Sequence, residues 1–407
     1  MQLIKRRRYL ERIRPFYHVD LVKLICGVRR AGKSVLLQSI RAELLEQGVA
    51  DKRIISLDLE LFDNAFINSA SMLNEVLEDS IRDDERHYIF IDEVQQVPDF
   101  EKVLSSVLSK YQASIFVTGS NSTLLSGELA TRLTGRSVEF EVLPFSFAEV
   151  KEFFEVNHLE FKEDCFFDYL KWGGLPRRFT LPGEDAFKLY AENLFKAIID
   201  KDIIKGDTGK RGQSLRTVML YVLANAGKSL SAEKIAQAYN SSHQTTISGR
   251  SIYHYLELMK SAFLVHPARC FYLSGKAALR SQEKYYAVDN VFRTLGTNTI
   301  DFEDTSYLKN IVFNELFSRG FTVHTGKTYK SEVDFVAVKD GRKCFIQVAY
   351  LLNSEDTIKR EFEAFAPIAD HAPKYVLSLD KIDLSHQGIT HLNLIDFLLN
   401  RKDLVLT

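Results

Sequence analysis

A glycine-rich segment near the N-terminus carries the strongest chemical signal in the sequence. Residues Gly27 to Ser34 read GVRRAGKS and match the pattern G-x-x-x-x-G-K-[ST] at every fixed position. Phosphate oxygens need several inward-pointing backbone N–H groups, and glycines let the backbone approach them closely. Lys33 would then contact the β- and γ-phosphates, and the Ser34 hydroxyl would bind Mg²⁺. A loop closed by glycines for packing alone is the alternative.

The pattern therefore predicts a site for ATP and Mg²⁺. Lys33 is expected to act in catalysis as well as in binding. Arg29 and Arg30 lie inside the loop, where they either touch phosphate or face solvent. The residues expected to bind the nucleotide are Gly27, Arg29, Arg30, Ala31, Gly32, Lys33, Ser34 and Val35.

An acidic strand end supplies the second element of this predicted site. Residues 88–93 read YIFIDE, an apolar run that carries two acids to one edge of the expected sheet. Asp92 is expected to hold Mg²⁺, directly or through water. Glu93 is expected to orient and polarise the attacking water. Many buried strands end in acids, so this motif gains its weight from the loop at residues 27–34.

The next apolar run also ends in polar residues, TGSN at positions 118–121. The side chain of Asn121 could lie between the γ-phosphate and the attacking water, which would make it a catalytic residue. A tight turn built on Gly119 and Asn121 explains the same residues equally well.

Two arginines follow in the segment ELATRLTGRSVEF, residues 128–140. An arginine aimed at the phosphates of a neighbouring subunit would stabilise transition-state charge, and this would require a homo-oligomer. The alternative is a surface ion pair of small energy. Arg136 is favoured over Arg132 as the catalytic arginine because it begins a predicted strand at a domain edge.

The elements that position these residues alternate between strands and helices. Strands are predicted over residues 21–27, 53–60, 87–95, 113–122 and 136–146. Helices are predicted over residues 33–48, 67–83 and 100–111. Alternation of this kind, with apolar runs that lack a strict period of two, predicts a buried parallel sheet covered by helices.

The rest of the chain divides into three further predicted regions after the nucleotide-binding core, residues 1–146. Residues 147–213 are helical and aromatic and are interpreted as a lid or linker. Residues 214–286 predict a helix-turn-helix followed by a wing. Residues 287–407 predict a separate α/β domain.

The last helix of the predicted winged-helix region gives a site for DNA. Its apolar positions recur at i, i+4 and i+7, which predicts a buried stripe of Ile252, Leu256 and Met259. Arg250, Tyr253 and His254 would lie mostly elsewhere, where a DNA groove could receive them. A packing or protein-binding module is the alternative.

Together these motifs resemble those of AAA+-type prokaryotic ATPases that carry a C-terminal DUF4143 domain. The resemblance rests on GVRRAGKS, YIFIDEVQ, VTGSNS with LLSGELATRLTGR, and WGGLPR, and it covers nearly the whole chain. Residues 284–290, 310–321 and 332–350 look like the C-terminal domain. The resemblance implies an AAA-like sheet, a winged-helix region and a restriction-endonuclease-like fold. It implies an ATP-hydrolysing enzyme without defining its task.

The nuclease-like region departs from the pattern that cleavage needs. A metal-dependent nuclease of that fold requires an acid on one strand and acid-x-Lys on the next. Glu315 lies on a predicted helix, and Asp334 lies in the strand EVDFVAV. Gln347 then occupies the acid position and Ala349 the lysine position, and neither is a good ligand for Mg²⁺. We therefore expect a fold retained for binding or scaffolding.

Charge and cysteine usage limit the possible partners. The formal net charge of −1 over 407 residues argues against a wholly basic nucleic-acid coat protein. The four cysteines lie far apart without a CxxC pair, which disfavours zinc and disulfides and favours a reducing cytoplasm. No apolar run approaches the ~20 residues that cross a bilayer, so no membrane partner is expected.

The N-terminal segment is locally basic. Residues 1–14 contain six Lys and Arg against one Glu, a local charge of +5. The favoured interpretation is a solvated helix face that packs four apolar side chains inward, Leu3, Ile4, Leu10 and Ile13. A phosphate-contacting arm is the alternative.

Three functions compete on these grounds. The first is an ATP-hydrolysing protein that couples nucleotide state to domain rearrangement, on DNA or a protein partner. The second is a DNA-binding regulatory or scaffold protein with a nucleotide-controlled switch and no motor activity. The third, an ATP-dependent nuclease, is disfavoured by Gln347 and Ala349.

Overall fold

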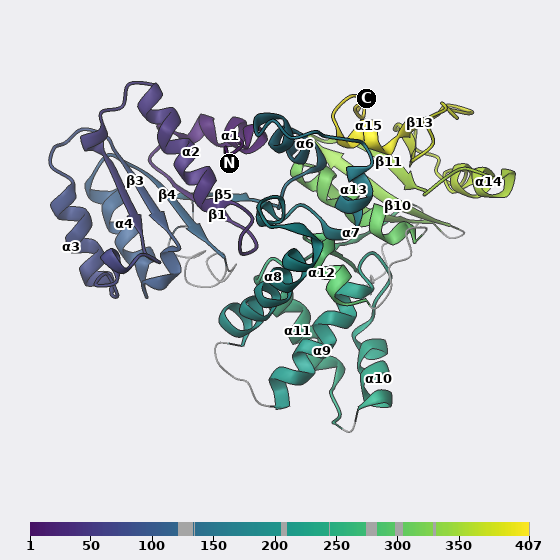
Figure 1. Ribbon diagram of the computed structural model, residues 1–407, viewed down its shortest axis with the longest axis horizontal. Helices are drawn as coiled ribbons and strands as arrows, with labels where there is room; N and C mark the ends of the chain where they lie inside the picture. Colours follow the sequence, from purple (N-terminus) through teal and green to yellow (C-terminus); the bar gives the residue numbers. More distant parts are fainter. Residues whose placement is uncertain are drawn as a thin grey trace. The chain divides into compact units, whose positions relative to one another are not determined.

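The computed structural model describes residues 1–120, 133, 135–204, 210–243, 245–273, 283–297, 304–328 and 331–406 (Figure 1). The chain forms two compact units. The first contains residues 3–142 with 261–263, and the second contains residues 1–2, 143–260 and 264–407. Asn121 and Arg132 lie outside the described residues. The finer division into four regions stays a prediction.

A five-stranded sheet lies at the centre of the first unit. Its strand order is β2-β3-β4-β1-β5, and every neighbouring pair is parallel, as predicted. The strands are β1 (Val22–Cys26), β2 (Ile54–Asp58), β3 (His87–Asp92), β4 (Ala113–Gly119) and β5 (Ser137–Glu141). Strands β1, β3 and β4 are buried along their whole length, which accounts for their largely apolar sequences without strict alternation.

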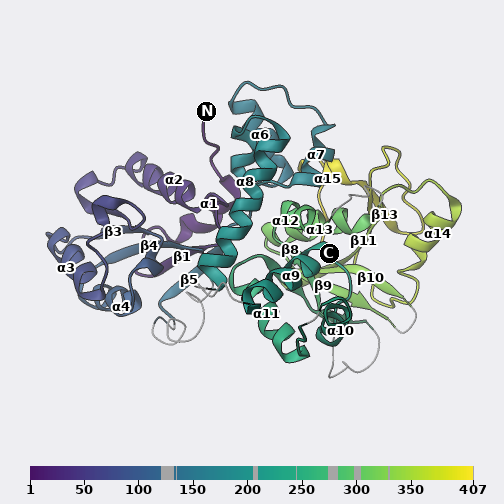
Figure 2. The same ribbon diagram turned by 60° about the horizontal axis from the view of Figure 1, so that its bottom comes forward.

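Helices cover both faces of this sheet (Figure 2). The helices are α1 (Arg7–Ile13), η1 (Arg14–Phe16), α2 (Lys33–Glu46), η2 (Asp51–Arg53), η3 (Phe62–Asn64), α3 (Ala70–Ser80), η4 (Val94–Gln96) and α4 (Phe100–Lys110). Successive side chains of a strand point to opposite faces. Ile89 and Ile91 pack in the cluster that includes Leu77 of α3 and Leu104 of α4. Phe90 lies on the opposite face and stacks on Phe116.

The second unit begins with a helical region rich in aromatic side chains. It contains α6 (Phe147–Val156), α7 (Cys165–Trp172), η6 (Pro176–Thr180), α8 (Gly183–Ala197) and the π-helix η7 (Ile198–Ile203). Ser146 and Glu149 form a capping box that fixes the start of α6. The segment WGGLPR ends α7 and turns the chain into η6.

Three helices and a pair of strands follow in the same unit. They are α9 (Lys210–Ala224), α10 (Ala232–Ser242), α11 (Gly249–Ser261), β6 (Val265–Ala268) and β8 (Lys284–Ala287). Strands β6 and β8 pair antiparallel, and Ser229 bridges to Lys284. Ile252, Leu256 and Met259 are buried on α11, as the periodicity predicted.

A six-stranded sheet forms the C-terminal part, in the order β13-β12-β11-β10-β9-β7. Its strands are β7 (Cys270–Tyr272), β9 (Thr322–Lys327), β10 (Glu332–Lys339), β11 (Arg342–Val348), β12 (Lys374–Ser378) and β13 (Ile389–Asn393). The accompanying helices are α12 (Asn290–Leu295), α13 (Thr305–Ser318), α14 (Glu355–Glu363) and α15 (Leu394–Leu398). Cys344 and Ile346 of β11 belong to one core cluster and Phe345 to another, so both faces of the sheet are covered.

Candidate functional site

The predicted phosphate loop connects β1 to α2 and depends on its two glycines. Gly27 has φ of +137°, and a Cβ there would lie 2.3 Å from the carbonyl oxygen of Val142. Gly32 has φ of +100° and precedes the first residue of α2. L side chains rarely adopt such backbone conformations, so the loop requires glycine at both positions. The backbone therefore has the curvature that a phosphate cradle needs.

Lys33 places a positive charge inside this loop. Its side chain is buried, and its Nζ donates hydrogen bonds to the carbonyls of Gly27 at 3.0 Å and Val28 at 3.2 Å. Burial lowers the pKa of Lys33 below its ordinary value, and the nearby charges of Glu93 and Asp92 oppose that shift. The ammonium and the two predicted acids thus share one electrostatic environment.

Thr118 connects the end of β4 to the acids at the end of β3. Its hydroxyl donates to the Asp92 carboxylate and accepts a hydrogen bond from the Glu93 backbone N–H at 2.9 Å. Glu93 has φ of +53°, and its carboxylate accepts hydrogen bonds from Gln95 and, at 3.4 Å, from Ser120. Asp92 and Glu93 are both buried. The strand ends therefore hold both carboxylates in fixed positions at the carboxyl edge of the sheet.

The other predicted nucleotide ligands differ in their exposure to solvent. Arg29 pairs with Glu60 at 3.6 Å, and Arg30 is exposed with φ of +66°. Ala31 is fully buried. Ser34 is exposed in the first turn of α2 and is followed by Val35. Within the described residues, the loop supplies backbone N–H groups, an ammonium and a hydroxyl, and the end of β3 supplies two carboxylates.

Arg136 precedes β5, which begins one residue later than predicted, at Ser137. Its guanidinium is exposed and donates to the Ser109 hydroxyl of α4 at 2.9 Å. This contact lies within the first unit, so a role towards another subunit stays a prediction.

The contact of Arg6 with the phosphate loop was missed by sequence reasoning. Arg6 was assigned to a solvated face, yet it is 1% exposed and its Nη1 donates to the Ala31 carbonyl at 3.0 Å. The spacing of Arg6, Leu10 and Ile13 at i, i+4 and i+7 was a usable signal for burial. The predicted inward packing of Ile4, Leu10 and Ile13 is confirmed, whereas Leu3 is exposed.

The chemistry of these groups fits Mg²⁺-nucleotide. Backbone N–H groups and Lys33 suit phosphate oxygens, and Ser34 with Asp92 supplies the oxygen ligands that Mg²⁺ prefers. Within the described part of the chain, no group of three or more His, Cys, Asp or Glu side chains could hold a metal ion alone. A metal at this site would therefore take part of its coordination from phosphate and water.

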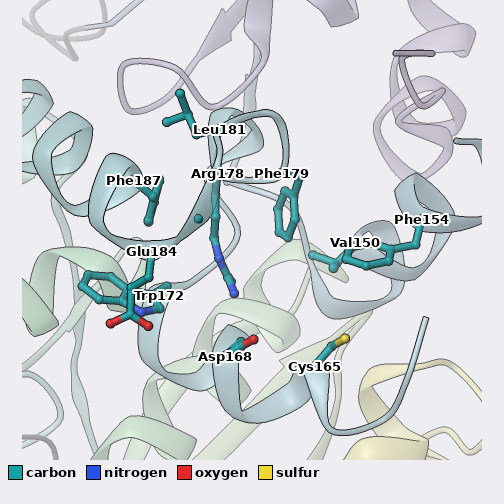
Figure 3. Close-up of a pocket in the computed structure, with 11 residues that line it drawn as sticks. Val150, Phe154, Cys165, Asp168, Trp172, Arg178, Phe179, Leu181, Glu184 and Phe187 are labelled. Atoms are coloured by element: carbon teal, nitrogen blue, oxygen red, sulfur yellow. The ribbon is translucent and has the colours of Figure 1, made fainter. Parts of the chain in front are cut away.

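The second unit contains a hollow of about 250 Å³ between α6, α7, η6 and α8 (Figure 3). Phe154, Trp172, Phe179 and Phe187 are among its lining residues, and the Arg178 side chain reaches into it. The Arg178 guanidinium donates to the Gly173 carbonyl at 2.6 Å. Arg178, which lines this hollow, therefore stabilises the turn in WGGLPR through its hydrogen bond to Gly173.

The same turn depends on Asp289. Its carboxylate accepts hydrogen bonds from the N–H groups of Gly174 at 2.8 Å and Val291 at 2.9 Å. A Cβ on Gly173 would lie 1.5 Å from the Asp289 carboxylate. The paired glycines in WGGLPR thus allow close approach to the start of α12, which gives this motif a structural role.

The C-terminal sheet contains a closed polar network at its predicted nuclease-like centre. Lys309 of α13 pairs with Asp334 at 2.6 Å, and the Val348 N–H donates to the same carboxylate at 2.9 Å. The Gln347 side chain accepts from the Asp334 N–H at 2.7 Å and donates to Glu361 at 2.8 Å. Both the oxygen and the nitrogen of the Gln347 amide are therefore hydrogen-bonded within the protein, and Lys309 neutralises Asp334.

The remaining predicted residues of this centre have other environments. Glu315 pairs with Arg319 at 2.6 Å. Ala349 is buried against the second face of the sheet.

Two family models match parts of this chain, one in the N-terminal region and one in the middle. A model described as an AAA domain matches residues 20–151. A model described as a domain of unknown function, DUF8612, matches residues 163–295. The DUF4143 resemblance of the C-terminal region therefore stays a prediction.

Two relatives extend over most of the chain. An uncharacterized protein of Haemophilus influenzae is 32% identical over 403 residues, which cover 98% of this chain and 99% of the relative. An uncharacterized protein of Methanocaldococcus jannaschii is 30% identical over 366 residues, covering 84% of this chain and 78% of the relative.

Among solved structures, the Walker-type ATPase of Pyrococcus abyssi is 18% identical. The alignment covers 71% of this chain and 93% of that structure, with a TM-score of 0.47. Among the described residues, no helix is both long enough and apolar enough to span a bilayer.

Proposed function

This chain belongs to the family of its Haemophilus influenzae relative and carries an AAA domain over residues 20–151; on that premise we propose that it is a Mg²⁺-dependent ATPase whose nucleotide state changes the arrangement of its domains. The single observation that carries the proposal is the Lys33 ammonium, buried in the glycine loop and coupled electrostatically to Asp92 and Glu93. A buried ammonium close to two carboxylates is the arrangement that binding of a magnesium-bound triphosphate requires.

Each side chain has a defined task in this proposal. Lys33 would leave the Gly27 and Val28 carbonyls and bind phosphate oxygens instead. Ser34 and Asp92 would hold Mg²⁺, which when bound neutralises charge on the phosphates. Glu93 would accept a proton from the attacking water. Thr118, through its bond to Asp92, would keep that carboxylate oriented.

A DNA partner is the second part of the proposal. The segment 214–286 contains nine Lys and Arg against three Asp and Glu, a formal charge of +6 in a chain of net charge −1. The order α9, α10, α11, β6, β8 supports a winged-helix arrangement. Arg250, Tyr253 and His254 are exposed on α11. A basic module with an exposed polar helix supports contact with DNA phosphates.

One feature of this module limits how it would bind. Strand β7, which follows β6 where a wing begins, pairs in parallel with β9 at the edge of the six-stranded sheet. A strand committed to that sheet is not available to a DNA groove. DNA contact would therefore rely on α11.

Nuclease activity is disfavoured by the network around Asp334. Lys309 neutralises this carboxylate, and the Gln347 amide is hydrogen-bonded to Asp334 and Glu361. The C-terminal sheet is proposed to act as a scaffold or binding surface.

The experiment that tests the proposal is phosphate release from Mg²⁺-ATP by wild type, Lys33→Ala and Glu93→Gln, with and without duplex DNA. Wild type should release phosphate, and both variants should fall at least 100-fold. Stimulation by DNA would support the DNA partner, and its absence would shift the proposal to a protein partner. Equal activity in wild type and Lys33→Ala would refute the ATPase assignment.

A further inference from the structure

We infer that Arg6, which lies outside the matched AAA domain, is a positioning residue for the phosphate loop. Its Nη1 donates a hydrogen bond to the Ala31 carbonyl at 3.0 Å, across 25 residues of sequence. The inference rests on the proposed function, because it concerns how this loop binds phosphate.

The geometry of the peptide bond explains why this contact matters. The Ala31 carbonyl and the Gly32 N–H belong to one planar peptide unit, and in a trans peptide they point in opposite directions. An acceptor held on one side therefore fixes the direction of the donor on the other. By binding the carbonyl of Ala31, Arg6 directs the N–H of Gly32 away from itself. Gly32 is the glycine whose N–H the loop pattern assigns to phosphate.

The Arg6 side chain is well placed to enforce this direction. It is 1% exposed, and its guanidinium lies 4.7 Å from the ring centre of Tyr9. A hydrogen bond from a charged donor is stronger than a neutral one, and it strengthens further at low local dielectric. The same bond polarises the peptide group, which makes the Gly32 N–H a better donor to an anion.

The segment that runs from Arg6 through α1 and η1 is itself tied to α2, the helix that follows the loop. Arg14 forms two hydrogen bonds to the Glu43 carboxylate, at 2.9 and 2.7 Å, and Tyr17 adds a third at 2.9 Å. The bonds from Arg14 hold the pKa of Glu43 below its ordinary value. Segment 6–17 therefore spans from the loop to the last turn of α2, so Arg6 is fixed at both its backbone and its side chain.

The test compares nucleotide affinity across four variants. Arg6→Met keeps the length of the stem and removes the donors, and Arg6→Lys restores one charged donor. Arg12→Met removes an exposed charge from the same helix. Arg14→Met removes the hydrogen bonds between η1 and α2 without touching the loop. The dissociation constants for Mg²⁺-ATP and for inorganic tripolyphosphate are measured by calorimetry at a temperature where every variant is folded.

Arg6→Met should weaken the binding of both ligands by about tenfold. Tripolyphosphate has no nucleobase, so its affinity reports on the phosphate loop alone. Arg6→Lys should recover most of that loss, and Arg12→Met should match wild type. Arg14→Met should lower the melting temperature and should weaken binding much less than Arg6→Met does. The inference is overturned if Arg6→Met binds like wild type, or if Arg14→Met weakens binding as much as Arg6→Met. Failure of wild type to bind ATP would instead remove the proposed function.

Discussion

The Gln95 side-chain amide donates a hydrogen bond to the Glu93 carboxylate, two residues before it at the end of β3. Ser120 contacts the same carboxylate oxygen at 3.4 Å. A hydrogen bond to a carboxylate oxygen occupies one of its acceptor sites. It also holds the side chain in one direction. Gln95 thus restrains the residue proposed to accept the proton from water.

Replacing Gln95 by Leu should raise kcat about threefold with little change in KM. The variant releases the Glu93 carboxylate from Gln95, so that it can turn towards the attacking water, while the phosphate loop stays intact. Steady-state phosphate release measures both constants. Gln96→Leu, an exposed neighbour, is the matched control and should behave as wild type. A fall in kcat for Gln95→Leu would mean that the amide orients Glu93 productively.

Replacing Gly27 by Ala should abolish ATP binding and lower the free energy of unfolding by about 2–3 kcal/mol. The new Cβ would lie 2.3 Å from the Val142 carbonyl oxygen, at a φ of +137°. Gly48→Ala is the control that separates backbone strain from steric clash. Gly48 has φ of +88°, but a Cβ there would have nothing within 4 Å. That control should cost about 1–2 kcal/mol and keep ATP binding. Urea unfolding and calorimetry check both variants.

Asp289 should make folding stability depend on pH. Burial raises its pKa from 3.8 to about 6. Between these values the folded protein holds a proton that the unfolded chain has released. Stability from this group is therefore fully present below pH 4, falls as pH rises through about 6, and is constant above. The total change is at most about 3 kcal/mol.

The measurement is the difference in unfolding free energy between wild type and Asp289→Asn from pH 4 to 8. Taking the difference removes the titration of other groups. The advantage of wild type over Asp289→Asn should shrink as the pH rises. A difference that stays level across this range would contradict the raised pKa.

Replacing Lys309 by Met should lower the free energy of unfolding by about 2–3 kcal/mol. The change leaves the buried Asp334 carboxylate without its cation, and the cost is below that of a fully enclosed pair because Lys309 is 23% exposed. The double variant Lys309→Met with Asp334→Asn should recover part of the loss. Chemical denaturation measures all three proteins, and additive losses would show that the two residues do not interact.

The sequence was sufficient where local pattern determines structure. Largely apolar runs without strict alternation predicted the parallel sheet because β1, β3 and β4 are buried on both faces. The glycine loop was predictable because its backbone conformation requires specific residue types at a fixed spacing. The buried stripe of α11 followed from its period in the same way.

Contacts between distant segments could not be predicted in this way. Arg6 reaches Ala31 across 25 residues, and Thr118 reaches Asp92 across 26. Lys309 meets Asp334 from a separate helix. In each case the partner is set by the tertiary arrangement of elements. The sequence limits which residue types can pair, while the fold determines which of them do.

The central claim is that the loop from Gly27 to Ser34 binds a nucleoside triphosphate. Calorimetric titration of Mg²⁺-ATP into wild type and into Lys33→Ala, at matched folded concentration, tests it most directly. We predict saturable binding by wild type and at least a 100-fold loss of affinity in Lys33→Ala. Absence of binding by folded wild type, or equal affinity in the two proteins, would contradict the account.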